Sequence, residues 1–181
     1  MPIETETGTK LTYADYVGIP EDGRRHEIIE GTHIVNPAPR PVHQSVVLRT
    51  SHELFRLETK GWAKVYIAPI DVQLTDHDVV QPDVIVIARQ NAGIIGDAKI
   101  EGVPDLVVEV LSPSTRRVDR GSKRALYEAA GVLEYWIIDP ERRTLERLTH
   151  VDGRFVTELF ASGPVASTAF LGFEFELDPI F

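Results

Sequence analysis

Apolar residues in the middle of the chain form short continuous runs, a pattern typical of strands buried on both faces of a sheet. The clearest runs span 84–87, 106–111 and 135–138. A helical pattern over 118–130, closed by Gly131, separates the last two. This order of strand, strand, helix and strand predicts an α/β fold with a mixed central sheet flanked by helices.

The segments around this centre predict further helices and hairpins. Apolar positions over 43–59 recur with helical spacing, and Thr12 can cap a shorter helix that precedes them. Turn residues at 30–31 and 152–153 each separate two short apolar segments. Additional β-hairpins are therefore expected near both ends of the chain.

Residues 65–74 alternate between apolar and polar positions, but the alternation changes phase at Pro69. A single strand can accommodate such a shift with a β-bulge. The pattern therefore predicts one bulged strand across this segment.

The length fits one domain, because 181 residues, of which 43% are hydrophobic, can bury one continuous core. We expect a single domain over 1–181, with a flexible polar start over 1–10 and an apolar cover segment over 162–181. Large apolar side chains in the cover segment either form a homodimer interface or cover the chain's own core. They are Phe170, Leu171, Phe173 and Phe175.

Several classes of protein lack their minimal parts in this sequence. No cysteine is present, which excludes disulfides and thiolate zinc sites, and the six histidines form no zinc-binding motif. Walker, dinucleotide-binding and GxSxG motifs do not occur. No segment approaches the roughly 18 apolar residues of a membrane span, and no secretory leader is recognisable. The expectation is a cytoplasmic protein without membrane contact.

The net charge of −9 argues against binding nucleic acid over the whole surface, because phosphates repel an acidic field. One local segment, 113–124, is basic and carries a single acidic residue, Asp119. It forms either a solvated helix face or a local contact to nucleic acid. Its basic residues are Arg116, Arg117, Arg120, Lys123 and Arg124.

Two carboxylates occupy positions where the pattern predicts burial or a strand end. Glu109 interrupts the apolar run 106–111 and shares a face with Val107 and Leu111, and Asp83 opens the run 84–87. A buried carboxylate is costly unless it is paired or bound to a cation. Oxygen ligands on neighbouring strands suit Mg²⁺ or Mn²⁺, which can activate water for phosphodiester hydrolysis.

Three further residues are candidates for supporting such a site. Lys123 can orient the attacking water or stabilise developing charge. Glu27 can point into the same cleft as a ligand or an acceptor, and His43 can meet the substrate or cap a helix. The alternative is structural, with Asp83 capping a turn and Glu109 pairing with Arg116 or Lys123 in a purely structural bridge.

Three stretches together resemble the Uma2 family (DUF820) of the PD-(D/E)XK nuclease superfamily. The first is Gln81-Pro82-Asp83 and the second is the run 102–115 around Glu109. The third comprises Asp119, Lys123, Tyr127 and the run 131–140.

This resemblance implies a restriction-endonuclease-like fold, with Asp83 and Glu109 as ligands of Mg²⁺ or Mn²⁺ and DNA as the substrate. Leu111 stands where the superfamily has its lysine, so Lys123 is the implied replacement, assisted by Glu27 and His43. The arginines of segment 113–124 become the expected nucleic-acid contacts. A catalytically inactive module of the same fold, binding nucleic acid or protein, is the alternative function.

Overall fold

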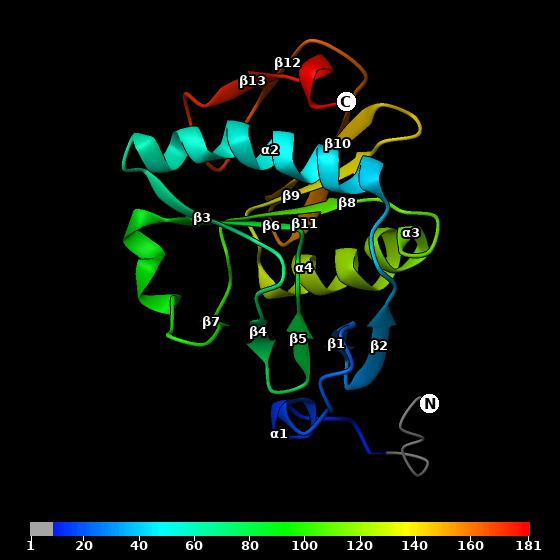
Figure 1. Ribbon diagram of the computed structural model, residues 1–181. Helices are drawn as coiled ribbons and strands as arrows, with labels where there is room; N and C mark the ends of the chain where they lie inside the picture. The colour runs from blue at the N-terminus through cyan, green and yellow to red at the C-terminus, as the bar shows by residue number, and fades with distance from the viewer. Residues whose placement is uncertain (1–8) are drawn as a thin grey trace.

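A six-stranded mixed sheet forms the centre of the structure, a computed structural model that describes residues 9–181 (Figure 1). Its order is β11-β10-β9-β8-β6-β3, and only β8 and β9 run parallel. The expected flexible start falls mainly on residues 1–8, which lie outside the described residues. The strands are β3 (Ala63–Ile67), β6 (Val84–Ala88), β8 (Leu106–Val110), β9 (Glu134–Asp139), β10 (Thr144–Val151) and β11 (Arg154–Phe160).

A second, five-stranded sheet has the order β2-β1-β5-β4-β7, with β4 and β7 parallel. The predicted hairpin at 30–31 joins its first two strands, and the short helix α1 (Tyr13–Val17) begins at the predicted cap Thr12. A 3-10 turn, η1 (Arg89–Ile94), precedes the last strand. The strands are β1 (Arg25–Ile29), β2 (Thr32–Asn36), β4 (Val72–Thr75), β5 (Asp78–Val80) and β7 (Ile100–Glu101).

The prediction of one bulged strand over 65–74 is wrong. This segment holds β3 and β4, which belong to different sheets. Val65 packs with the cluster under one face of the central sheet, and Val72 packs with the cluster on the other face. The change of phase at Pro69 therefore marks a change of sheet.

One face of the central sheet is covered by α2 (Pro41–Thr59) and the C-terminal segment (Figure 1). The helix starts two residues before the predicted His43, because the missing N–H of Pro41 costs nothing in the first turn. The C-terminal segment contains β12 (Pro164–Ala166), β13 (Glu174–Glu176) and η3 (Asp178–Ile180).

The C-terminal segment buries most of its large apolar side chains inside the chain itself. Phe170, Phe173 and Phe175 are at most 6% exposed and belong to the core between α2 and the sheet, whereas Leu171 is 84% exposed. Three of the four residues considered for a homodimer interface are therefore not accessible to a partner.

Glu134 at the start of β9 anchors this segment, although it is fully buried. Its carboxylate accepts hydrogen bonds from Trp136 Nε1 at 2.8 Å and from the N–H groups of Thr168 and Ala169 at 3.1 and 2.9 Å. Ser167 Oγ also donates to it. The carboxylate therefore satisfies several donors that burial has removed from water.

Replacing Glu134 with glutamine is expected to lower the free energy of unfolding by about 2 kcal/mol, because an amide presents one acceptor where several donors converge. Urea unfolding of the Glu134→Gln variant measures this loss. Glu176→Gln, on the exposed side of β13, is the matched control and should change stability little. Equal effects of the two substitutions would contradict the anchoring role.

The opposite face of the central sheet packs against the second sheet and a helical segment. This segment runs through α3 (Arg116–Val118), the π-helical turn η2 (Asp119–Lys123) and α4 (Arg124–Ala130). It ends at Gly131 with φ 81°, the left-handed cap that the sequence predicts. The predicted class, α/β with a mixed sheet between helices, is confirmed (Figure 1).

None of the helices within residues 9–181 combines the length and the apolar character required to cross a membrane.

Candidate functional site

Strand register brings Asp83 and Glu109 together. Val84 of β6 pairs with Val108 of β8 in antiparallel register, so Asp83, just before β6, lies opposite Glu109, which follows Val108 on β8. Both side chains belong to the face of the sheet that carries the helical segment and the second sheet. Each residue is only 3% exposed.

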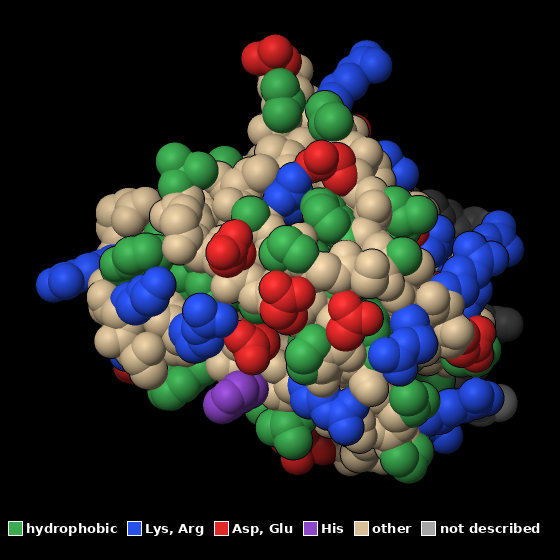
Figure 2. Space-filling view, turned by 90° about the horizontal axis from the view of Figure 1, so that it is seen from above, with side chains coloured by type: hydrophobic (Ala, Val, Ile, Leu, Met, Phe, Trp, Pro, Cys, Tyr) green, Lys and Arg blue, Asp and Glu red, His purple; other side chains and the backbone are tan. Residues whose placement is uncertain are grey.

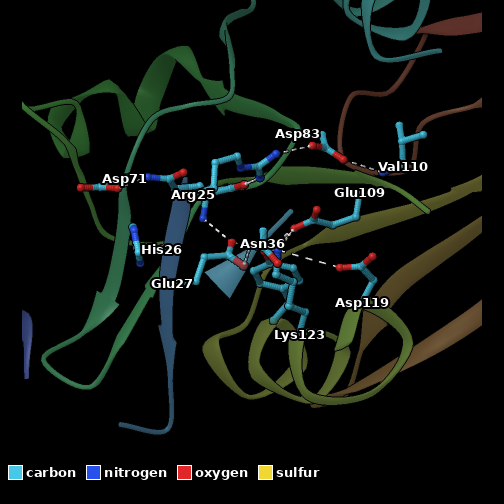
Figure 3. A network of polar contacts seen from close by, with 12 residues as sticks. Arg25, His26, Glu27, Asn36, Asp71, Asp83, Glu109, Val110, Asp119 and Lys123 are labelled. Atoms are coloured by element: carbon cyan, nitrogen blue, oxygen red, sulfur yellow. Dashed lines mark hydrogen bonds and ion pairs between the residues drawn. The ribbon is translucent and has the colours of Figure 1, made fainter. Parts of the chain in front are cut away.

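Asp83 is held by donors from three elements, and Figure 3 shows two of them, Arg25 and Val110. Arg25 Nη1 donates to Oδ1 at 3.1 Å, while the N–H of Val110 at 2.8 Å and His43 Nε2 at 3.1 Å meet Oδ2. Burial alone would raise the pKa of Asp83, but the contacts with His43, Arg25 and Val110 outweigh it and lower that pKa. Asp83 is therefore a carboxylate in the folded protein.

At Glu109, in contrast to Asp83, the effect of burial on the pKa is not outweighed by the neighbouring cation. Lys123 Nζ lies 2.8 Å from its Oε1, and the hydroxyl of Tyr127 donates to the same atom at 3.0 Å. Burial raises the pKa of Glu109 well above its usual value; Lys123 opposes this shift, and the neighbouring carboxylates add to it. Among residues 9–181, the hydrogen bonds and ion pairs of this carboxylate all end on Oε1.

Lys123 is the buried cation of the cluster. It is 3% exposed and lies 2.9 Å from Glu27 Oε1, 2.8 Å from Glu109 Oε1 and 3.9 Å from Asp119 Oδ1. Burial would lower the pKa of Lys123, but these three carboxylates raise it above its usual value. Lys123 therefore carries a positive charge and has no free base to accept a proton from water.

Glu27 links the second sheet to this cluster. It is fully buried, and its Oε1 accepts a hydrogen bond from the N–H of Gln81 at 2.7 Å in addition to meeting Lys123. Asn36 Nδ2 donates to Oε2 at 2.6 Å. Glu27 and Arg25 lie two residues apart on β1, so both point towards the cluster, whereas His26 points away (Figure 3).

Asp119 is a further buried carboxylate, 2% exposed, whose pKa burial raises from 3.8 to about 6. The folded protein therefore holds this proton more tightly than the unfolded chain does, and the stability attributable to Asp119 falls as the pH rises through 6. Asp119→Asn is expected to raise the free energy of unfolding at about pH 8 and to change it little near pH 4.

Urea unfolding of the parent and Asp119→Asn at both pH values, with EDTA present, measures this difference. A lower stability of the variant at the higher pH would mean that Asp119 contributes mainly as an ion-pair partner of Lys123.

A cavity of about 280 Å³ opens onto the cluster. Its wall includes Asp83, Glu109, Asp119 and Lys123, and on the other side Arg25 and the connection 36–40 between β2 and α2. The acidic cluster therefore forms part of a cavity wall and is not enclosed in the core.

The donor set fits a hard divalent cation. The cluster holds more acidic than basic side chains, because Arg25 and Lys123 lie among four acidic residues: Glu27, Asp83, Glu109 and Asp119. Within residues 9–181, no three His, Asp or Glu side chains form a ready metal cage. Two carboxylates completed by water and phosphate are nevertheless a common arrangement for Mg²⁺.

The four arginines of the basic helical segment do not line this cavity. Arg116 Nη2 lies 3.0 Å from Glu141 Oε2, and Arg120 pairs with Glu146, while both also approach Asp139. Arg124 donates to Thr157 at 3.4 Å, and Arg117 is exposed. Acidic residues of the β9–β10 hairpin therefore offset much of the charge that the sequence displays.

The structure brings together Asp83, Glu109 and Lys123 with both residues expected to assist them. His43 contacts Asp83, and Glu27 contacts Lys123. Sequence reasoning missed Arg25 as part of the site. The available signal was its spacing of two from Glu27 in a strand, which places both side chains on one face.

Comparison with known proteins defines the family of this chain. The Uma2 family, described as "Putative restriction endonuclease", matches residues 13–179. The chain therefore belongs to the Uma2 family, and the predicted resemblance is confirmed.

A solved structure extends the comparison. The crystal structure of "a putative nuclease belonging to DUF820" from Anabaena variabilis ATCC 29413 has a TM-score of 0.79 and 20% identity, and covers 94% of this chain and 97% of that chain. At this identity the likeness establishes a shared fold. None of the curated proteins matched the chain.

Proposed function

We propose that this protein is a metal-dependent endonuclease that hydrolyses phosphodiester bonds in DNA. One observation carries the proposal: Asp83 and Glu109 meet on adjacent strands at the wall of a cavity, with Lys123 Nζ 2.8 Å from Glu109. Membership of the Uma2 family supports the reaction class. The metal, the substrate and the roles of the residues are the proposed parts.

Asp83 and Glu109 are the proposed holders of Mg²⁺ or Mn²⁺. Such a cation, when bound, polarises a phosphoryl oxygen and lowers the pKa of a bound water. His43 and Val110 orient Asp83 through its Oδ2, and Tyr127 orients Glu109 through its Oε1. The two carboxylate groups are therefore oriented by protein donors before a substrate arrives.

Lys123 is proposed to act as an ammonium rather than as a general base. Its charge is maintained by Glu27, Glu109 and Asp119, and its N–H groups can donate to the oxygens of a phosphate undergoing attack. Water attacks phosphorus and loses a proton to solvent, the bond from phosphorus to one sugar oxygen breaks and that oxygen takes up a proton from solvent, and charge builds on the phosphate oxygens. A fixed positive charge lowers the energy of that transition state.

DNA would meet the protein at the cavity rather than across the whole surface. Figure 2 looks onto α2 and the C-terminal segment and shows acidic side chains across the middle of that face, with Lys and Arg nearer its rim. Phosphates are repelled from such a face. The cavity instead presents Arg25 and Arg40 beside the carboxylates.

Incubation of the purified protein with supercoiled and linear DNA, in Mg²⁺, Mn²⁺ or EDTA, tests the proposal. Nicking or cutting in a metal and none in EDTA is expected, and an RNA of equal length tests the choice of nucleic acid. Binding of DNA without cleavage in either metal would contradict the proposal and favour the inactive module of the same fold.

A further inference from the structure

We propose that Arg25 competes with the divalent cation for Asp83 and becomes the phosphate-binding arginine of the site when that cation binds. The inference rests on the proposed function and deepens it, because it assigns the contact to the scissile phosphate. Arg25 lies on β1 of the second sheet, away from the segment in which the sequence concentrates its arginines.

Competition follows from how Asp83 uses its two oxygens. Oδ2 is engaged by the N–H of Val110 at 2.8 Å and by His43 Nε2 at 3.1 Å. Oδ1 meets only Arg25 among residues 9–181, with Nη1 at 3.1 Å. Oδ1 is therefore the oxygen through which Asp83 would hold a metal ion, and the guanidinium lies against it.

Electrostatics favour the replacement of Arg25 by a divalent cation at Asp83. A guanidinium and a divalent cation both neutralise Asp83, and two positive groups that share one oxygen repel each other. The carboxylates of Glu27 and Glu109 also attract Arg25 and would attract the cation that replaces it. Binding of the ion therefore weakens the electrostatic attraction that holds Arg25 at Asp83 Oδ1.

The surroundings of Arg25 give its guanidinium room to move. Its side chain is 22% exposed and lines both the cavity over the carboxylates and an adjoining cavity of about 550 Å³. The two cavities share Arg25 and residues 36–39. Rotation about side-chain bonds would therefore keep the guanidinium beside one of the two cavities that it lines.

The remaining contacts of Arg25 suit a phosphate ligand. Nη2 donates to the carbonyl of Gln81, and the buried Nε has no hydrogen-bond partner among the described residues. A guanidinium presents its N–H groups as a planar fork that matches two oxygens of a phosphate. After release from Asp83, it could therefore bind the phosphate and use donors that the protein leaves available.

Calorimetric titration of Mn²⁺ into the parent and into Arg25→Gln, without DNA, tests the competition. The variant is expected to bind Mn²⁺ about tenfold more tightly, because the competing charge has been removed. Anisotropy of a labelled DNA duplex with Ca²⁺, which takes the same kind of oxygen ligands, tests the phosphate contact. The variant is expected to bind this duplex about tenfold more weakly.

Arg24→Gln is the matched control, because Arg24 is exposed, lies next to Arg25 and pairs only with Asp22 among the described residues. It should leave Mn²⁺ affinity unchanged. Arg25→Lys should retain Mn²⁺ affinity near that of the parent but recover only part of the DNA affinity, since lysine lacks the planar fork.

Opposite changes in the two affinities are the signature of the proposal. Weaker Mn²⁺ binding by Arg25→Gln would mean that Arg25 supports the geometry of Asp83, and unchanged DNA binding would remove the phosphate contact; either result overturns the inference. Both measurements are made without cleavage. If both affinities change as expected but the parent cuts no DNA, the nuclease proposal alone is refuted. If the parent cuts DNA but the affinities do not change in this way, the role of Arg25 alone is refuted.

Discussion

Glu109→Ala is expected to lower metal-dependent DNA cleavage by at least about a thousandfold, because a metal site contributes several kcal/mol of transition-state stabilisation. The substitution removes the carboxylate whose Oε1 also fixes Lys123. Both the cation and the ammonium would therefore lose their position. Initial rates of plasmid nicking in Mg²⁺ and Mn²⁺ measure the effect.

Glu101→Ala is a suitable control for this loss, because the Glu101 side chain is 63% exposed and its carboxylate forms, among the described residues, an ion pair with Lys99 at 3.4 Å. Its cleavage rate should equal that of the parent. Thermal melting in EDTA checks that Glu109→Ala is folded, and melting with added Mg²⁺ should stabilise the parent but not this variant. A folded Glu109→Ala protein that cuts DNA at the rate of the parent would show that the site has been assigned wrongly.

Lys123→Ala is expected to reduce the free energy of unfolding by about 3–5 kcal/mol near pH 8, because it leaves buried carboxylates without their cation. Glu27, Glu109 and Asp119 all lie within 4.0 Å of its ammonium. The loss should be smaller near pH 5, where Glu109 and Asp119, whose pKa values are already raised, can take up protons. Urea unfolding at both pH values provides the comparison.

Lys64→Ala supplies the matched case for a surface ion pair. Lys64 lies 2.9 Å from Glu58 Oε1, close to the separation of Lys123 and Glu109, but its side chain is 53% exposed. Its removal should cost no more than about 1 kcal/mol. Similar losses for the two lysines would show that burial of the cluster does not control its energetics.

The sequence revealed the carboxylates because strand periodicity is a strong signal. Glu109 interrupts a run of apolar residues, and its place on the same face as Val107 follows from the alternation of a strand. The placement of Asp83 opposite Glu109 is not visible in the periodicity of either strand, since it depends on the pairing of β6 with β8. Resemblance to a family supplied that pairing indirectly.

The basic segment illustrates what a sequence cannot display. Charges on 116–124 are visible in the chain, but their partners Asp139, Glu141 and Glu146 come from a hairpin that folds back beside the helix. Arg25, by contrast, is an isolated arginine in the sequence and reaches the site through its strand. The arginine that lines the cavity over the carboxylates therefore lies outside the segment with the highest local charge density, and nucleic-acid contact by that segment stays a prediction.

Short strands were the least predictable part of the fold. β5 has three residues and β7 has two, so neither offers enough periodicity to be recognised. The segment 65–74 was misassigned because a bulge and a change of sheet give the same shift of phase. Only the packing partners of Val65 and Val72 separate the two cases.

The contacts of Glu27 link the second sheet to the helical segment that carries Lys123, in addition to balancing the charge of Lys123. One carboxylate from the smaller sheet holds both Gln81, just before β6, and Lys123 on the opposite helix. Any cation that relieves the crowding of negative charge would also strengthen this junction. Loading the site should therefore slow amide hydrogen exchange in the first hairpin, because Glu27 ties that hairpin to Gln81 and Lys123.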